Sequence, residues 1–483
     1  MQWKRFDNIK EDPKLNLIRS TAKLFISRIG ANVLSFAAIA YFTQILGPSN
    51  MGVFFLFQSL VGVLALVADL GIRGAVEKRL SEQGGNHGVL ATSILIKTGL
   101  LVVVCLLLLV FKARVNNYVG YDIIYFLILG LFLKEYFELF ERVLIGEHRV
   151  DETGTLLFLR RVTWIIMGST LLFVGYGIIA LLIAFLLSYF ISLLWAVIKV
   201  STPISRSLEF NVSSIFSYSK HYFISQAGGR LYSWIDIVVL GFFVSSSFVG
   251  IYELAWRVSL VVMLFAQSIA NVIFPEISSI AADNGYAKIK SIVPDALSAA
   301  LFISIPALFG TLVLADRIME VLFNVIHPVG GVILIIIMTE KVLQAPHRVL
   351  ARVSEGIGRP EFGARATAIT IIINIFANLL LISLLGVIGA ALATLISFGA
   401  NTAIHWIYLQ TEVKIKVPFR DIIWYVLSSV GMCIAIYKLT WPHYVSPFIS
   451  LAGTVGFGAI LYAIIVVSNP RMRTKVVGVI KSV

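Results

Sequence analysis

Cysteine and charged residues are both scarce in this sequence. The 483 residues include two cysteines, Cys105 and Cys433, and each lies inside a long apolar run, which excludes a disulfide framework or a cysteine-rich metal cluster. Charged residues make up 13% of the chain and hydrophobic residues 58%, with a mean hydropathy of +0.91. A soluble domain of this size has too small a core for so many apolar side chains. The composition therefore predicts a protein that is embedded in lipid.

Motifs for nucleotide hydrolysis and for hydrolytic catalysis are absent as well. The chain has no Gly-rich phosphate loop, no Gly-x-Ser-x-Gly nucleophile turn and no His-Glu-x-x-His pair. The expected outer loops are no longer than roughly 15 residues, which leaves no room for the chemistry of a glycan polymerase or ligase. We therefore expect that the protein is not an enzyme and has no cofactor and no metal site.

Apolar runs of about 17 to 25 residues follow one another along the chain, and each can cross the hydrocarbon layer as a helix. They predict an all-α integral membrane protein with about fourteen transmembrane helices. The expected helices are 24–46, 52–72, 91–111, 122–145, 157–175, 178–199, 217–243, 248–272, 293–315, 330–350, 363–384, 387–409, 420–438 and 446–468.

The positions of lysine and arginine predict how these helices are oriented. With a cytoplasmic N-terminus, the inner segments hold 29 of the 39 basic residues and the outer loops hold four. Cytoplasmic loops are enriched in Lys and Arg, so we expect both termini on the cytoplasmic side of the cell membrane. Residues 1–23 lack the pattern of a cleaved signal peptide. The net charge of +13 is spread over these loops rather than gathered in one soluble patch, so no nucleic-acid partner is expected.

An internal repeat relates the two halves of the chain. Phe25–Gly30 recurs as Phe223–Gly228, and 12 of 44 aligned pairs are identical between 25–68 and 223–266. About four identities are expected by chance in a chain of this composition. The repeat predicts two halves with the same helix order.

A second repeated phrase supports this division. Arg142–Leu144 recurs 206 residues later as Arg348–Leu350, at the ends of the fourth and tenth expected helices. Two parallel six-helix lobes with a substrate site between them are a transporter design. The expected parts are a cytoplasmic interfacial segment 1–23, an N-lobe 24–199, a cytoplasmic linker 200–216, a C-lobe 217–409, terminal helices within 410–468 and a cytoplasmic tail 469–483.

Several stretches resemble one family of transporters. Gly358–Pro360, Asn374–Ile382 and Gly386–Ser397 look very like the eleventh and twelfth helices of polysaccharide flippases, and the small residues of the third stretch favour close helix packing. Leu46–Phe54 and Val249–Tyr252 resemble the glycine-containing turns of that family. Over essentially its whole length the chain resembles the O-antigen and exopolysaccharide branch of the multidrug/oligosaccharidyl-lipid/polysaccharide exporter superfamily.

This resemblance implies a flippase that moves a polyprenyl-diphosphate-linked oligosaccharide, an O-antigen or exopolysaccharide unit, across the cytoplasmic membrane by alternating access. Such a role would belong to lipopolysaccharide or other polysaccharide biosynthesis. The implied partners are the lipid-linked glycan and membrane lipids, with a glycan polymerase and chain-length proteins as further candidates. A cation-coupled exporter of small drugs from the same superfamily is the alternative.

Cationic residues at membrane depth are the leading candidates for substrate binding, because a charge within hydrocarbon is costly. Arg230 lies at the middle of the seventh expected helix, and its repeat mate is Asn32. Arg28 lies one turn from Asn32 on the same face, and Arg257 lies on the eighth expected helix. Together these four residues predict a cationic lumen that would bind an anionic diphosphate.

Structural pairing is the alternative for two of these arginines. Arg257 follows Glu253 by four residues, a spacing that brings side chains together on a helix. Arg230 has Asp236 on the same expected helix as a candidate partner. Asp236 and Glu253 are therefore candidates either for ion coupling or for pairing.

Two further acidic residues are candidates of the same kind. Glu340 lies at the centre of the tenth expected helix beside Lys341, and because the two are adjacent we expect them to point apart and to need separate partners. Asp69 lies near the inner end of the second expected helix, where its carboxylate is expected to snorkel towards water.

Polar pairs at a spacing of four occur on two other helices. In the fourth expected helix, Lys134, Glu138 and Arg142 predict a stripe that pairs with itself near the cytoplasmic side. In the eleventh, Asn374 and Asn378 share one face, so we expect their amides to hydrogen-bond to a neighbouring helix.

Overall fold

The computed structural model describes residues 13–82, 88–203, 219, 223, 234–283, 285–439 and 446–473. The regular elements in these ranges are all helices, and eleven of them are long and apolar enough to cross a membrane. The chain is therefore an all-α, multi-pass membrane protein, as the composition predicts. The number fourteen stays a prediction, because most of the expected helix 217–243 lies outside the described residues.

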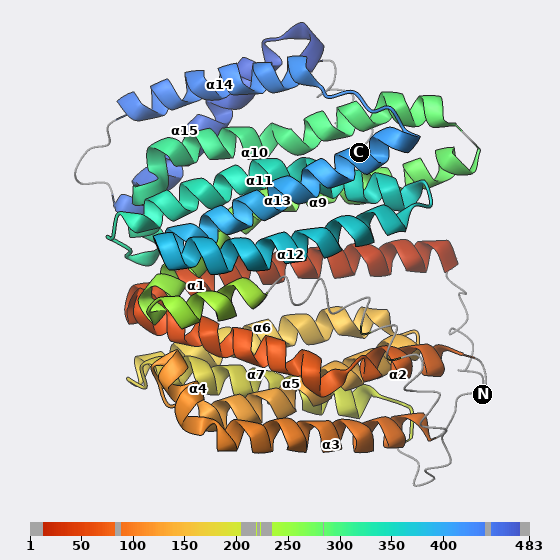
Figure 1. The fold of residues 1–483 in the computed structure, drawn as a ribbon, viewed down its shortest axis with the longest axis vertical. Helices are drawn as coiled ribbons and strands as arrows, with labels where there is room; N and C mark the ends of the chain where they lie inside the picture. The colour runs from red at the N-terminus through yellow and green to blue at the C-terminus, as the bar shows by residue number, and fades with distance from the viewer. Residues whose placement is uncertain are drawn as a thin grey trace, which may run out of the picture. The chain divides into compact units, whose positions relative to one another are not determined.

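The chain forms two compact units (Figure 1). The N-terminal unit comprises Met1–Leu46 and Val53–Ile235, and the C-terminal unit comprises Gly47–Gly52 and Asp236–Val483. The boundaries of the expected lobes, linker and tail stay predictions.

The N-terminal unit is built from seven labelled helices. They are α1 (Pro13–Asp69), α2 (Ile72–Ser81), α3 (Val89–Val110), α4 (Lys112–Val119), α5 (Ile124–Gly146), α6 (Val150–Phe173) and α7 (Ile178–Lys199). Helix α1 contains the first expected helix and most of the second, and its helical geometry is interrupted at Gly47, with φ 77° and ψ 166°. Because that positive φ suits glycine and Pro48 follows directly, the sequence itself explains the break.

Aromatic rings fill the core of this unit. The Phe42 and Trp164 rings meet edge to face with centroids 5.1 Å apart, and Phe54 stacks on Trp164 at 5.6 Å. Phe57 meets Phe185 edge to face at 5.1 Å. Each such pair contributes about 0.5–1.5 kcal/mol beyond area burial. These ring contacts join α1, α6 and α7.

The C-terminal unit contains the short helix Trp234–Phe243 from Asp236 onward and seven labelled helices. They are α9 (Ser246–Ala282), α10 (Tyr286–Phe323), α11 (Val329–Gly356), α12 (Pro360–Leu385), α13 (Val387–Glu412), α14 (Phe419–Lys438) and α15 (Pro447–Val467). In Figure 1, α10, α11 and α13 run alongside one another, and α12 packs on α13.

Glycine sets the closest approaches in this unit. Gly386 ends α12 and precedes α13 with φ 59°, and a Cβ on Gly389 would overlap the carbonyl of Leu381. Gly52 and Gly250, which are aligned in the internal repeat, also lie against each other, and a Cβ on Gly250 would overlap the carbonyl of Pro48. The close helix packing expected from the small residues of Gly386–Ser397 is therefore confirmed at Gly389.

Candidate functional site

Asp236 is a buried carboxylate at the centre of a polar cluster in the C-terminal unit. It lies on the helix Trp234–Phe243, and the residue is 8% exposed. Asn378 Nδ2 on α12 donates to Asp236 Oδ1 at 2.8 Å, and Thr394 Oγ1 on α13 lies 3.3 Å from Asp236 Oδ2. The expected hydrogen bond from Asn378 to a neighbouring helix is thus confirmed.

Two more side chains extend this set. Asn378 Nδ2 lies 3.1 Å from Asn374 Oδ1, and the Tyr252 hydroxyl on α9 lies 3.1 Å from Thr394 Oγ1. Both asparagines, the threonine and the tyrosine are buried. We call these five residues, from four helices, the Asp236 cluster.

The Asp236 carboxylate forms no ion pair within 4.0 Å among the described residues: its hydrogen bonds come from an amide and a hydroxyl. An isolated buried carboxylate is costly, and removing the charge with a proton or a bound cation lowers that cost. The cluster offers oxygen atoms from a carboxylate, two amides and two hydroxyls, which are the ligands that hard cations prefer. Asn378 Oδ1 is buried without a hydrogen-bond partner in the described part of the chain. The arrangement can therefore hold a proton or a small alkali cation.

A second charged group lies on α11. Lys341 Nζ is 2.7 Å from Glu340 Oε2 and 3.4 Å from Gln344 Oε1, and the acid and the base are both 0% exposed. Lys341 Nζ also lies 3.5 Å from the centroid of the Trp256 ring. The expectation that Glu340 and Lys341 point apart is wrong: their long side chains curl back to form one ion pair, so Glu340 has a cation next to it.

Arg257 makes the structural pair that its spacing allows. Its Nε lies 3.3 Å from Glu253 Oε2, one turn earlier on α9. The guanidinium side chain is 23% exposed and the carboxylate side chain 7%. Glu253 therefore has an intrahelical partner, and a role for Arg257 in substrate binding stays a proposal.

The other lumen candidates are only partly described. Arg230 lies outside the described residues. Arg28 lies in α1, but its side chain is also outside them. Asn32 lies on α1 with an exposed side chain. The predicted cationic lumen stays a prediction.

The N-terminal unit contains a buried charge network centred on Lys97 of α3. Lys97 Nζ lies 2.6 Å from Asp69 Oδ1 and 2.6 Å from Glu135 Oε2, and both the lysine and Glu135 are 0% exposed. Arg73 Nε lies 2.8 Å from Asp69 Oδ2. The expectation that Asp69 snorkels is wrong, because two buried cations satisfy its carboxylate inside the protein.

The α5 stripe forms one of its expected pairs and also pairs with α2. Lys134 pairs with Glu138 at 3.6 Å, as predicted, and Glu138 also pairs with Arg73. Arg142 pairs with Glu77 of α2 at 2.7 Å. Sequence reasoning missed Arg73 and Lys97 as network members. A basic residue inside the apolar run 91–111 was the available signal for Lys97.

Comparison with known proteins identifies the family. A family model described as polysaccharide biosynthesis protein matches residues 17–281. The chain is 38% identical over 461 residues to the "Probable low-salt glycan biosynthesis flippase Agl15" of Haloferax volcanii, covering 95% of this chain and 97% of that protein. It is 27% identical over 461 residues to the "Probable flippase AglR" of the same organism, covering 94% and 96%. The chain belongs to the polysaccharide biosynthesis protein family, and the resemblance stated above is confirmed.

Solved structures agree on the fold. The lipid II flippase MurJ in an inward closed conformation has a TM-score of 0.77 at 18% identity, covering 92% of this chain and 98% of that one. An inward-facing multidrug resistance MATE family transporter of the MOP superfamily has a TM-score of 0.63 at 17% identity, covering 79% and 94%. At these identities the comparisons establish a shared fold.

Proposed function

We propose that this protein is a flippase that moves a lipid-linked oligosaccharide across the cytoplasmic membrane. The observation that carries the proposal is the match along 95% of the chain to a protein named as a probable glycan biosynthesis flippase. The substrate class proposed is a polyprenyl diphosphate that bears an O-antigen-like or exopolysaccharide unit. Fourteen helices, in two six-helix lobes and a terminal pair, would carry it by alternating access.

The diphosphate would bind the cationic lumen predicted from Arg28, Asn32, Arg230 and Arg257. Arginine suits this task because its guanidinium can donate two parallel hydrogen bonds to a phosphate. The lipid tail would stay in the bilayer while the charged head group crosses. The protein would then be a transporter and not an enzyme, with membrane lipids and the lipid-linked glycan as its partners.

The Asp236 cluster supplies a candidate coupling element for this cycle. An oxygen-rich cluster that is neutralised by a proton or an alkali cation changes its charge when an ion gradient is imposed. Asp236 is our leading candidate for ion coupling, because Glu253, Glu340 and Asp69 are each satisfied by a neighbouring cation.

The proposal is tested by flipping in proteoliposomes. A fluorescent polyprenyl-diphosphate disaccharide is reconstituted with the protein, and protection of the fluorophore from a membrane-impermeant quencher is followed under imposed sodium, proton or electrical gradients. Arg230→Ala should abolish flipping and Arg230→Lys should restore part of it, because lysine keeps the charge but loses the bidentate geometry.

The same vesicles distinguish the alternative, a cation-coupled drug exporter. The buried carboxylate of Asp236 is the observation that favours it, since a site for cationic drugs needs acidic groups. Uptake of a lipophilic cation such as ethidium, with no flipping of the lipid-linked glycan, would overturn the flippase proposal.

A further inference from the structure

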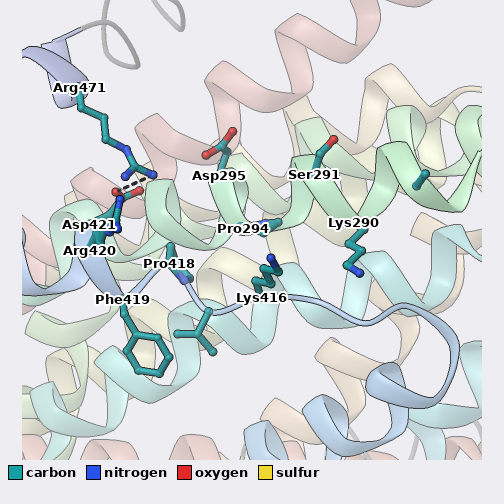
Figure 2. Close-up of a pocket in the computed structure, with 12 residues that line it drawn as sticks. Lys290, Ser291, Pro294, Asp295, Lys416, Pro418, Phe419, Arg420, Asp421 and Arg471 are labelled. Carbon is teal, nitrogen blue, oxygen red and sulfur yellow. Dashed lines mark ion pairs between the residues drawn. The ribbon is translucent and has the colours of Figure 1, made fainter.

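A basic cavity lies at one end of the C-terminal unit, away from the Asp236 cluster. Its volume is about 790 Å³, and it is lined by the first turns of α10, the segment leading into α14 and Arg471 beyond α15 (Figure 2). Four basic side chains line it, Lys290, Lys416, Arg420 and Arg471, against two acidic ones, Asp295 and Asp421. The lining therefore carries a net positive charge.

The acidic residues are partly engaged by the protein itself. Asp421 is 1% exposed; its Oδ2 accepts a hydrogen bond from Ser298 Oγ at 2.8 Å, and its Oδ1 lies 3.8 Å from Arg471 Nη2. In contrast, the side chains of Lys290, Lys416 and Arg420 make no ion pair or hydrogen bond within the described part of the chain. These three cations are exposed around one cavity.

The cavity lies where membrane-spanning helices leave the hydrocarbon. Its lining residues come from the start of α10, the start of α14 and the residues after the end of α15. Helix α10 has 38 residues and is about 57 Å long at 1.5 Å per residue, which exceeds the roughly 30 Å hydrocarbon layer. Its polar first turns therefore reach the level of the lipid head groups.

The rim of the cavity also has an apolar side. Phe419 lines it and is 66% exposed. The first backbone N–H groups of α14 start beside it and favour a negative charge. A ligand with an anionic phosphate head and an apolar chain would fit both the basic lining and the apolar rim of this cavity.

We propose that this cavity binds the phosphate head group of an anionic membrane phospholipid, with the lipid chain against Phe419. Basic clusters at the membrane surface attract anionic lipids, and a cavity between helix ends adds a defined position for one head group. This inference goes beyond the proposed function and does not depend on it, because α10, α14 and α15 would bind a resident lipid whether or not a glycan is moved.

The test measures lipid binding to the full chain in maltoside micelles by native mass spectrometry. Dioctanoyl phosphatidylglycerol should bind at least tenfold more tightly than dioctanoyl phosphatidylcholine, and the triple variant Lys290→Gln, Lys416→Gln, Arg420→Gln should lose this preference. The single variant Lys416→Gln should lose part of it.

The matched control removes the same charge from neighbouring positions outside the cavity lining. Lys288, Lys414 and Arg473 are exposed and lie on α10, before α14 and after α15. Their triple change to glutamine should alter the affinity for phosphatidylglycerol less than twofold. An equal loss in both triple variants would mean diffuse surface attraction and would overturn the proposal.

A further experiment distinguishes a site for a lipid head group from a site for free phosphate. Phe419→Ser should weaken binding of phosphatidylglycerol, while inorganic pyrophosphate should compete poorly with that lipid in the unchanged protein. Pyrophosphate that displaces the lipid at equal concentration, with no effect of Phe419→Ser, would show a free-phosphate site instead. Equal affinity for the anionic and the zwitterionic lipid would also refute the site.

Discussion

Asp236 differs from the other buried acidic residues at the level of single side chains, because its described contacts are neutral. Asn378 and Thr394 hydrogen-bond to its carboxylate. In contrast, Asp69 forms an ion pair with Lys97, and Glu340 forms one with Lys341. A carboxylate held by neutral donors can lose its charge without leaving a buried cation unpaired. We therefore propose Asp236, rather than the paired acids, as the site of ion coupling.

Asp236→Asn tests this role directly. The change keeps the side-chain shape but removes the charge, so we expect the dependence of flipping on the ion gradient to be lost; coupling between two sites typically changes binding affinity by about 5- to 150-fold. Thermal stability should stay equal or rise, because a buried charge is gone. Flipping rates with and without an ion gradient measure the coupling, and the melting temperature measures the stability.

Asp283→Asn is the matched control, since Asp283 is exposed at the end of α9. It should leave rate and gradient dependence unchanged. Full retention of gradient dependence in Asp236→Asn would refute the coupling role.

Lys341 is expected to matter for stability. Lys341→Met leaves Glu340 as a buried, unpaired carboxylate, which should cost about 3–5 kcal/mol of unfolding free energy. The double variant Glu340→Gln with Lys341→Met should recover most of that loss. Arg352→Met breaks an exposed ion pair with Glu355 on the same helix and should cost less than about 1 kcal/mol. Thermal unfolding in detergent measures the stability of all three variants. Equal losses of stability for Lys341→Met and Arg352→Met would contradict the prediction.

At the scale of elements, α12 and α13 pack so closely that their backbones come into contact at Gly389. A Cβ at Gly389 would overlap the carbonyl of Leu381, so Gly389→Ala must push α13 away from the end of α12. We expect this variant to lose roughly 1–3 kcal/mol or more of unfolding free energy, as other overpacked sites do.

Gly456→Ala is the comparison, since Gly456 lies in α15 with no atom within 4 Å of an added Cβ. This change should be neutral or stabilising by up to about 1 kcal/mol, because alanine favours a helix. Yield of folded monomer by size exclusion and the melting temperature measure both variants. A Gly389→Ala protein as stable as the parent would contradict the predicted overlap.

Features that depend on neighbouring residues could be predicted from the sequence, whereas contacts between distant residues could not. Membrane spans are predictable because apolar length is a local property, and the Gly47 break follows from a local Gly-Pro pair. The partners of Asp236 are 142 and 158 residues away in the chain, and no helical period encodes such contacts. The prediction for Glu340 and Lys341 is wrong for a different reason: assigning adjacent residues to different helix faces neglects that long side chains can bend back to a neighbour.

The terminal helices matter at the scale of the whole molecule because they present apolar surface on one side and polar contacts on the other. Ile423, Leu427 and Ile460 are exposed and suit contact with lipid chains. On the other side, Tyr425 OH lies 3.0 Å from Ser298 Oγ of α10, and Tyr462 OH donates to the Phe302 carbonyl at 2.9 Å. The pair is thus anchored to α10 and leaves an apolar face exposed.

Truncation after Val417 tests this division of roles. Removing α14 and α15 deprives Ser298 of its described partners, so the melting temperature should fall, but the remaining apolar helices should still insert in the membrane. If the exposed face of the pair guides the tail, flipping of a long-chain polyprenyl substrate should fall at least tenfold. A short-chain analogue with the same head group should lose less than threefold, because it needs no groove. Comparing the two substrates within one preparation cancels any loss of folded protein, so an equal fall for both would show that α14 and α15 support the fold alone.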